Sequence, residues 1–194
     1  MPVEKIVPDA TTTPHATWTE TSGGSGDVHL ALDADDTNFA RCTTVTKSFI
    51  VSFGNLTSDI NSINSIRFYV NGYDSGIRGA SDVVSFDLLN SSDSSYSLSE
   101  NKTFTDGTLS TVQAGTERTT SDGSTAWTES DVNGLKMQVT WATENNANCI
   151  LNLDHLYINV DYVENVLAPY DNTLNNVTLN SGTITVSGGT LILD

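Results

Sequence analysis

The densest group of metal-ligating side chains in the sequence lies in the stretch "DVHLALDADDTN". Asp33, Asp35 and Asp36 lie close together there, flanked by Asp27 and Asn38. Their oxygens are hard ligands of the kind that Ca²⁺ prefers, although the glycine and glutamate of an EF-hand loop are missing. The same residues also favour a solvated turn, because Asp is a good turn former. Both interpretations stay open, and Ca²⁺ is the single cofactor that the sequence indicates.

The sequence offers few groups for catalysis. Its three histidines are His15, His29 and His155, and it contains no nucleophile elbow, zinc-protease motif or phosphate-binding loop. His155 follows Asp154 in a strand-like segment, but geometry rather than adjacency in the chain makes a general base. We therefore expect a protein that is not an enzyme.

Two tryptophans are candidates for contact with a glycan. Trp18 and Trp127 both lie in Thr-rich segments, where an exposed indole could stack on a sugar ring. The alternative is packing in the core, because most Trp side chains are largely buried. The choice between these two depends on how the surrounding segments fold.

Alternation of apolar and polar residues predicts strands throughout the chain. In four segments the apolar residues share one face: Leu135, Met137, Val139 and Trp141; Leu156, Ile158, Val160 and Tyr162; Val84, Phe86 and Leu88; Ile66, Phe68 and Val70. Turn-forming stretches such as "NGYDSG" and "NSSDSS" separate them. The only helical signal is a short capped turn at Thr128–Val132, ended by Gly134. The pattern predicts an all-β fold, an antiparallel β-sandwich of jelly-roll type.

The charge balance argues against two kinds of partner. The chain has 24 acidic and 8 basic residues and a net charge of −16, so it repels both nucleic-acid phosphates and anionic membrane surfaces. It has no stretch of about 20 apolar residues, and "MPVEKIVPDATTT" lacks the features of a signal peptide. We therefore expect synthesis in the cytoplasm, no nucleic-acid partner and no membrane partner.

The C-terminal segment "VTLNSGTITVSGGTLILD" repeats an apolar pair at seven-residue steps. The pairs are Val177 and Leu179, Ile184 and Val186, and Leu191 and Leu193. Such short strands do not form a stable sheet alone. We predict a sandwich domain over residues 1–163, a linker at 164–172 and an oligomerising β-repeat tail at 173–194, intertwined in a trimer. The alternatives are a tail folded back on its own domain, added as a strand to a neighbour, or disordered.

Four segments together resemble β-sandwich virion structural proteins of tailed bacteriophages, of the capsid cement or decoration type. They are "KIVPDATTTPHATWT", "LALDADDTNFARC", "SFIVSFGNLTSDINSINSIRFYV" and "LDHLYINVDYV", and the resemblance covers about residues 4–163. It implies a location in the virion, with the major capsid protein or another virion protein as partner. A trimer fits a cement protein at a three-fold axis.

The order "ALDADDTNF…FIVSFG" is also similar to that of galactose-binding-like jelly rolls. This second resemblance implies an alternative function as a carbohydrate-binding module. The resemblance to virion proteins also implies the alternative of a tail or fibre subunit, involved in adsorption to the host surface. In such domains the acidic turn can hold Ca²⁺ and an aromatic side chain supports a sugar.

Overall fold

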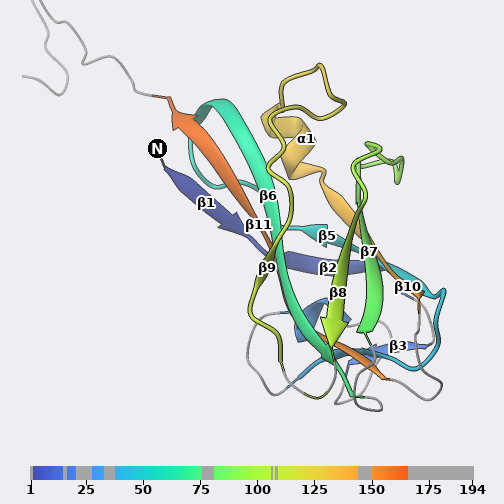
Figure 1. The fold of residues 1–194 in the computed structure, drawn as a ribbon. Helices are drawn as coiled ribbons and strands as arrows, with labels where there is room; N and C mark the ends of the chain where they lie inside the picture. The colour runs from blue at the N-terminus through green and yellow to red at the C-terminus, as the bar shows by residue number, and fades with distance from the viewer. Residues whose placement is uncertain are drawn as a thin grey trace, which may run out of the picture.

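Two antiparallel β-sheets face each other across a shared core (Figure 1). The computed structural model describes residues 2–14, 17–20, 28–32, 38–75, 81–105, 107, 109–143 and 150–165. Within these residues the secondary structure is overwhelmingly strand. The predicted all-β class and the antiparallel two-sheet arrangement are therefore confirmed.

Sheet A has six strands and is organised around β11. Its strands are β1 (Val3–Ile6), β3 (Trp18–Glu20), β4 (Ala40–Cys42), β6 (Ile60–Asp74), β9 (Gln113–Ala114) and β11 (Leu151–Glu164). The order is β3-β4-β11-β6-β9, with β1 added to β11. One edge of β11 pairs with β6 along its whole length. The other edge pairs first with β4, over 151–153, and then with β1, over 158–161.

Sheet B has five strands in the order β2-β5-β10-β7-β8. They are β2 (Pro8–Thr13), β5 (Ser48–Phe53), β7 (Ser81–Leu89), β8 (Glu100–Thr105) and β10 (Lys136–Thr143). The chain changes sheet at most of its connections, and only Val7 separates β1 in sheet A from β2 in sheet B. Frequent crossing is why both sheets are built from strands that are distant in sequence.

The inner faces of the two sheets form one apolar core. The residues predicted to share faces are buried there: Leu135, Met137, Val139, Trp141, Leu156, Ile158, Val160, Tyr162, Val84, Phe86, Leu88, Ile66, Phe68 and Val70. The sheets contact each other through aromatic pairs. Trp18 packs edge-on against Phe49 at 4.7 Å, and Phe68 stacks on Phe86 at 5.3 Å between ring centroids. Each such buried side chain stabilises the fold by roughly 1.5–3 kcal/mol.

The described helices are short and lie between strands. The 3₁₀ helix η1 spans Val28–Ala31 and the α-helix α1 spans Glu129–Asn133. The predicted capped turn is confirmed at α1, because Thr128 and Asp131 form a reciprocal capping box and Gly134 follows the helix. The Asn133 side chain accepts a hydrogen bond from the Leu56 backbone at 2.8 Å, which fixes α1 against the segment before β6.

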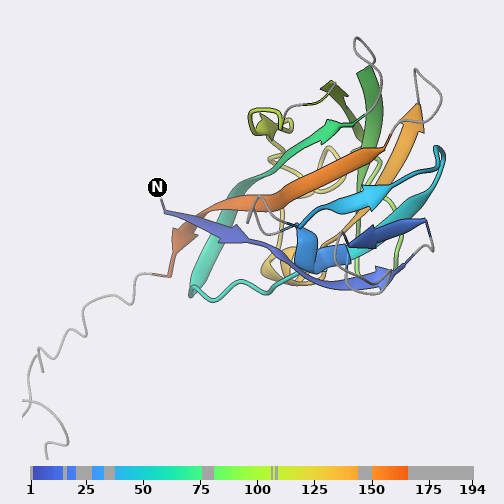
Figure 2. The ribbon, with the colours of Figure 1, turned by 90° about the horizontal axis from the view of Figure 1, so that it is seen from below.

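The first described strand begins and the last one ends at the same corner of the sandwich (Figure 2). The backbone N–H of Tyr162 donates to the carbonyl of Pro2 there, and that of Asn165 donates to Asp59. Strand β11 runs to Glu164, one residue past the boundary predicted at residue 163. The rest of the predicted linker and the tail at 173–194 lie outside the described residues.

Candidate functional site

Two sets of predicted site residues lie outside the part of the chain that the structure describes. They are Asp33, Asp35 and Asp36 of the predicted Ca²⁺ site, and Val177, Leu179, Ile184, Val186, Leu191 and Leu193 of the predicted oligomerisation tail. Both therefore stay predictions. Among the described residues, no group of three or more His, Cys, Asp or Glu side chains is arranged to hold a metal ion.

Both candidate glycan-stacking tryptophans lie in the core. Trp18 is 0% exposed and Trp127 is 3% exposed. Their indole N–H groups donate to the backbone carbonyls of Lys47 and Arg118, each at 3.0 Å. Burial of an indole is favourable once its N–H is satisfied in this way. Of the two alternatives that the sequence leaves open for Trp18 and Trp127, the structure supports packing in the core.

An aromatic pair instead stands on the outer face of sheet A. Tyr69 of β6 and Tyr157 of β11 are directly opposite each other across the two strands. Their rings stack at 4.8 Å between centroids with only 7° between planes. We call the outward side chains around this pair, on β1, β6 and β11, the tyrosine face. Cross-strand aromatic pairs stabilise a sheet by roughly 0.2–1 kcal/mol.

Lys5 and His155 complete one side of the tyrosine face. The Lys5 ammonium lies 4.3 Å from the centroid of the Tyr157 ring, a cation–π contact, and 3.0 Å from Nε2 of His155. An ammonium can only donate, so His155 Nε2 accepts and the ring proton belongs on Nδ1. The pKa of Tyr157 is raised by partial burial and by the neighbouring Tyr69 phenol. The Tyr157 ring is therefore held by contacts from β1, β6 and its own strand.

A shallow hollow of about 160 Å³ opens beside Tyr69. It is lined by Val3, Ser65, Arg67, Tyr69, Glu117, Asn159 and Asp161. Glu117 accepts hydrogen bonds from Ser65 at 2.8 Å and from Arg67 at 3.0 Å. Both side chains of the ion pair remain accessible, at 37% for Arg67 and 52% for Glu117. The hollow therefore brings donors, acceptors and one aromatic ring together.

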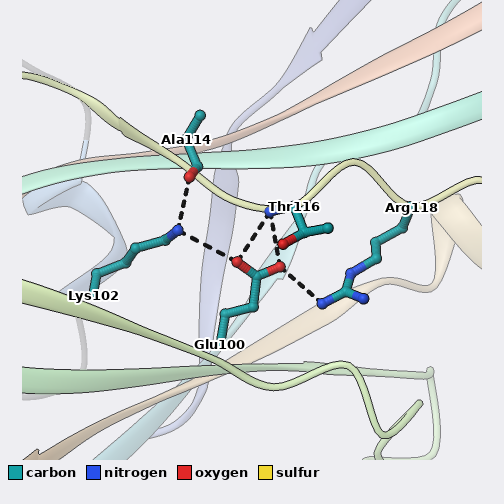
Figure 3. A network of polar contacts seen from close by, with 5 residues as sticks. All are labelled: Glu100, Lys102, Ala114, Thr116 and Arg118. Carbon is teal, nitrogen blue, oxygen red and sulfur yellow. Dashed lines mark hydrogen bonds and ion pairs between the residues drawn. The ribbon is translucent and has the colours of Figure 1, made fainter.

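The segment that carries Glu117 is held from the opposite sheet (Figure 3). Glu100 of β8 accepts hydrogen bonds from the Thr116 backbone at 2.8 and 3.0 Å, from Arg118 at 2.9 Å and from Lys102 at 3.3 Å. Burial alone would raise the pKa of Glu100, but these hydrogen bonds and the Lys102 charge lower it below its ordinary value. The side chains of Glu100, Lys102 and Arg118 are partly buried, and the network connects sheet B to the edge of sheet A.

The same segment also pairs with β6. The Gly115 N–H donates to the Phe68 carbonyl at 2.8 Å, and Arg118 exchanges two backbone hydrogen bonds with Ile66. A side chain at Gly115 would collide with the Phe68 ring, so only glycine allows this close approach. Glu117 lies between Gly115 and Arg118, whose backbones are both hydrogen-bonded to β6. This position beside β6 brings the Glu117 side chain to the hollow.

Comparison with known proteins adds no relative: no protein-family model and no curated protein sequence matches the chain. None of the helices described is long and apolar enough to cross a membrane. The candidate site therefore stands on geometry alone. Alternation along β11 indicated that Tyr157, Asn159 and Asp161 face away from the core, whereas no sequence signal connected them with Lys5, Arg67 or Glu117.

Proposed function

We propose that the protein is a non-enzymatic structural protein of a virus particle, of the capsid cement or decoration type, built on a jelly roll. The observation that carries this proposal is the strand order of the two sheets. A fold alone does not determine a function. The proposal therefore combines the strand order with the sequence resemblance to virion proteins of tailed bacteriophages.

The strand order supports a jelly roll through eight consecutive strands. Sheet A contains the run β4-β11-β6-β9 and sheet B the run β5-β10-β7-β8. The first of the eight strands lies beside the last, the second beside the seventh, the third beside the sixth and the fourth beside the fifth. This is the order expected when one long antiparallel ribbon wraps into two sheets as paired Greek keys. Viral capsid domains and lectins use this architecture.

We also propose that residues 173–194 join three copies of the chain, with the apolar pairs of the tail buried between them. The corner where β11 ends supports this assembly. The end of β11 lies beside the start of β1 at one end of the sandwich (Figure 2). A tail that continued outward from this corner would meet a neighbouring copy without crossing either sheet. Closed cyclic symmetry would use the same surface on every copy.

Two measurements test the assembly and the location. Light scattering on the full chain should give three times the mass of one chain, and a variant ending at Asn165 should be a monomer with an unchanged β circular dichroism spectrum. The full chain should also copurify with virus particles in many copies per particle. A full chain that remains monomeric at high concentration and ignores assembled capsids would refute the proposal. A few copies per particle would instead indicate a tail or fibre subunit.

A further inference from the structure

We infer that the hollow on the tyrosine face binds one ring of a neutral saccharide. This inference concerns a ligand rather than the particle, and it does not depend on the proposed virion function. It rests on the size of the hollow, on the chemistry of its lining and on the rigidity of the side chains around it.

The size of the hollow fits a small ligand unit. Its volume of about 160 Å³ is below the roughly 300–1,000 Å³ of pockets for drug-sized molecules. A single sugar ring is a compact unit of this smaller scale, and the rest of a saccharide chain can extend over the open sheet. A flat protein partner would need a much larger surface, since specific interfaces bury about 800 Å² on each side.

The lining has groups that suit both the hydroxyl groups and the apolar C–H side of a sugar ring. Arg67 and Asn159 supply N–H donors, while Glu117 and Asp161 supply carboxylate acceptors. Sugar hydroxyls donate and accept at once, so a mixed set of donors and acceptors satisfies them. The apolar C–H side of a sugar ring can pack on the Tyr69 side chain, as ligand sites combine an aromatic wall with a few fixed polar groups.

Several side chains of the lining already have partners before any ligand arrives. Arg67 is held by Glu117, and Asp161 accepts a hydrogen bond from the Asn64 amide at 3.3 Å. Tyr69 is held by Tyr157, whose ring also contacts Lys5. Side chains that are already ordered lose less conformational entropy on binding, which improves affinity for a small ligand.

The charges favour a neutral saccharide over an acidic one. Two carboxylates line the hollow against one guanidinium, and the whole chain carries a net charge of −16. A sulfate, phosphate or uronic acid would be repelled by both. The ion pair between Arg67 and Glu117 also leaves the guanidinium partly neutralised.

The test is a glycan array of neutral and acidic saccharides, run on the purified chain in a chelating buffer so that Ca²⁺ sites do not contribute. The best neutral saccharide is then titrated against the wild type and against N159A and E117Q. We expect each substitution to weaken binding about tenfold or more, since N159A removes a polar group and E117Q replaces a carboxylate oxygen with an amide donor. The control is Q138A, on the outer face of sheet B, which should bind like the wild type.

Thermal melting of each variant confirms that the fold is retained. A third variant, Y69A, checks the aromatic wall independently of the polar groups. The inference is overturned if no neutral saccharide binds at millimolar concentration, if acidic saccharides bind better, or if N159A, E117Q and Y69A all bind like the wild type. None of these results bears on the virion proposal, because the array needs no particle and no trimer.

Discussion

The outer faces of the two sheets differ, although both cover the same core. On sheet B most outward side chains are hydroxyls and other polar groups with single contacts, apart from Lys136, which pairs with Asp93 at 2.7 Å. Ser52 donates to Asp9 at 2.6 Å, and Gln138 donates to Ser48 at 3.3 Å. On sheet A the tyrosine face carries two stacked rings, a lysine, a histidine and an ion pair, most of them with two or more partners.

The outer face of sheet B is a solvated surface, whereas the side chains of the tyrosine face on sheet A are held by contacts with one another. Single contacts between short polar side chains keep the face of a sheet solvated at little energetic cost. Aromatic rings retained on an outward face, next to fixed donors and acceptors, are typical of surfaces that recognise a partner. We therefore expect substitutions on sheet A to change binding and substitutions on sheet B to be nearly neutral.

The largest loss of stability should come from a substitution in the core, because the core supports both outer faces equally. Phe86 is fully buried and stacks on Phe68 between the sheets. F86A should lower the free energy of unfolding by about 3–5 kcal/mol and disturb both outer faces together. Denaturant titration measures this loss, and F86L should lose less because it leaves a smaller cavity. A loss below about 1 kcal/mol would contradict this packing.

The next largest effect should come from the network that joins the two sheets. E100Q should cost about 2 kcal/mol, because the Glu100 side chain is only 13% exposed and receives charge-assisted hydrogen bonds. The matched control E117Q removes a more exposed ion pair and should cost at most about 1 kcal/mol. Equal losses in the two variants, measured by denaturant titration, would argue against Glu100 as the connection between the sheets.

The same carboxylate predicts a pH dependence. The pKa of Glu100 in the folded protein lies below its ordinary value of 4.5. Its contribution to stability is therefore fully present above pH 4.5 and is lost as the pH falls through the lower folded value. Melting temperatures measured from pH 6 downward should fall less steeply for E100Q than for the wild type. If the melting temperatures of E100Q and the wild type fell equally with pH, the pH dependence would not come from Glu100.

The smallest stability effects should separate the two faces. Y157A on sheet A removes a ring stack and a cation–π contact and should cost about 1 kcal/mol. S85A on sheet B lies opposite Thr140 in the same central region of its own sheet and should stay within about 0.5 kcal/mol. Thermal melting in parallel measures both. A larger loss of stability for S85A than for Y157A would contradict the expected difference between the two faces.

Much of the fold could be predicted from the sequence, because the alternation of apolar and polar residues in a strand depends only on neighbouring positions. The inward residues of β10 and β11 and the cap of α1 follow from neighbours within a few positions. The choice between a buried and an exposed Trp18 could not be made from the sequence, because its indole N–H is satisfied by the carbonyl of Lys47, 29 residues away. The hollow could not be predicted for the same reason. It joins Val3, Arg67, Glu117 and Asn159, which come from four separate parts of the chain.

The pairing of β11 with β1, β4 and β6 has a consequence for biosynthesis. Sheet A lacks its middle until this strand has emerged from the ribosome, because β1 and β4 contact β6 only through it. Until β11 is available, the edges of β1, β4 and β6 that it will pair with stay exposed and must not pair with other strands. Contacts between such distant segments form slowly, so we expect sheet A to form late in folding, only after β11 is available.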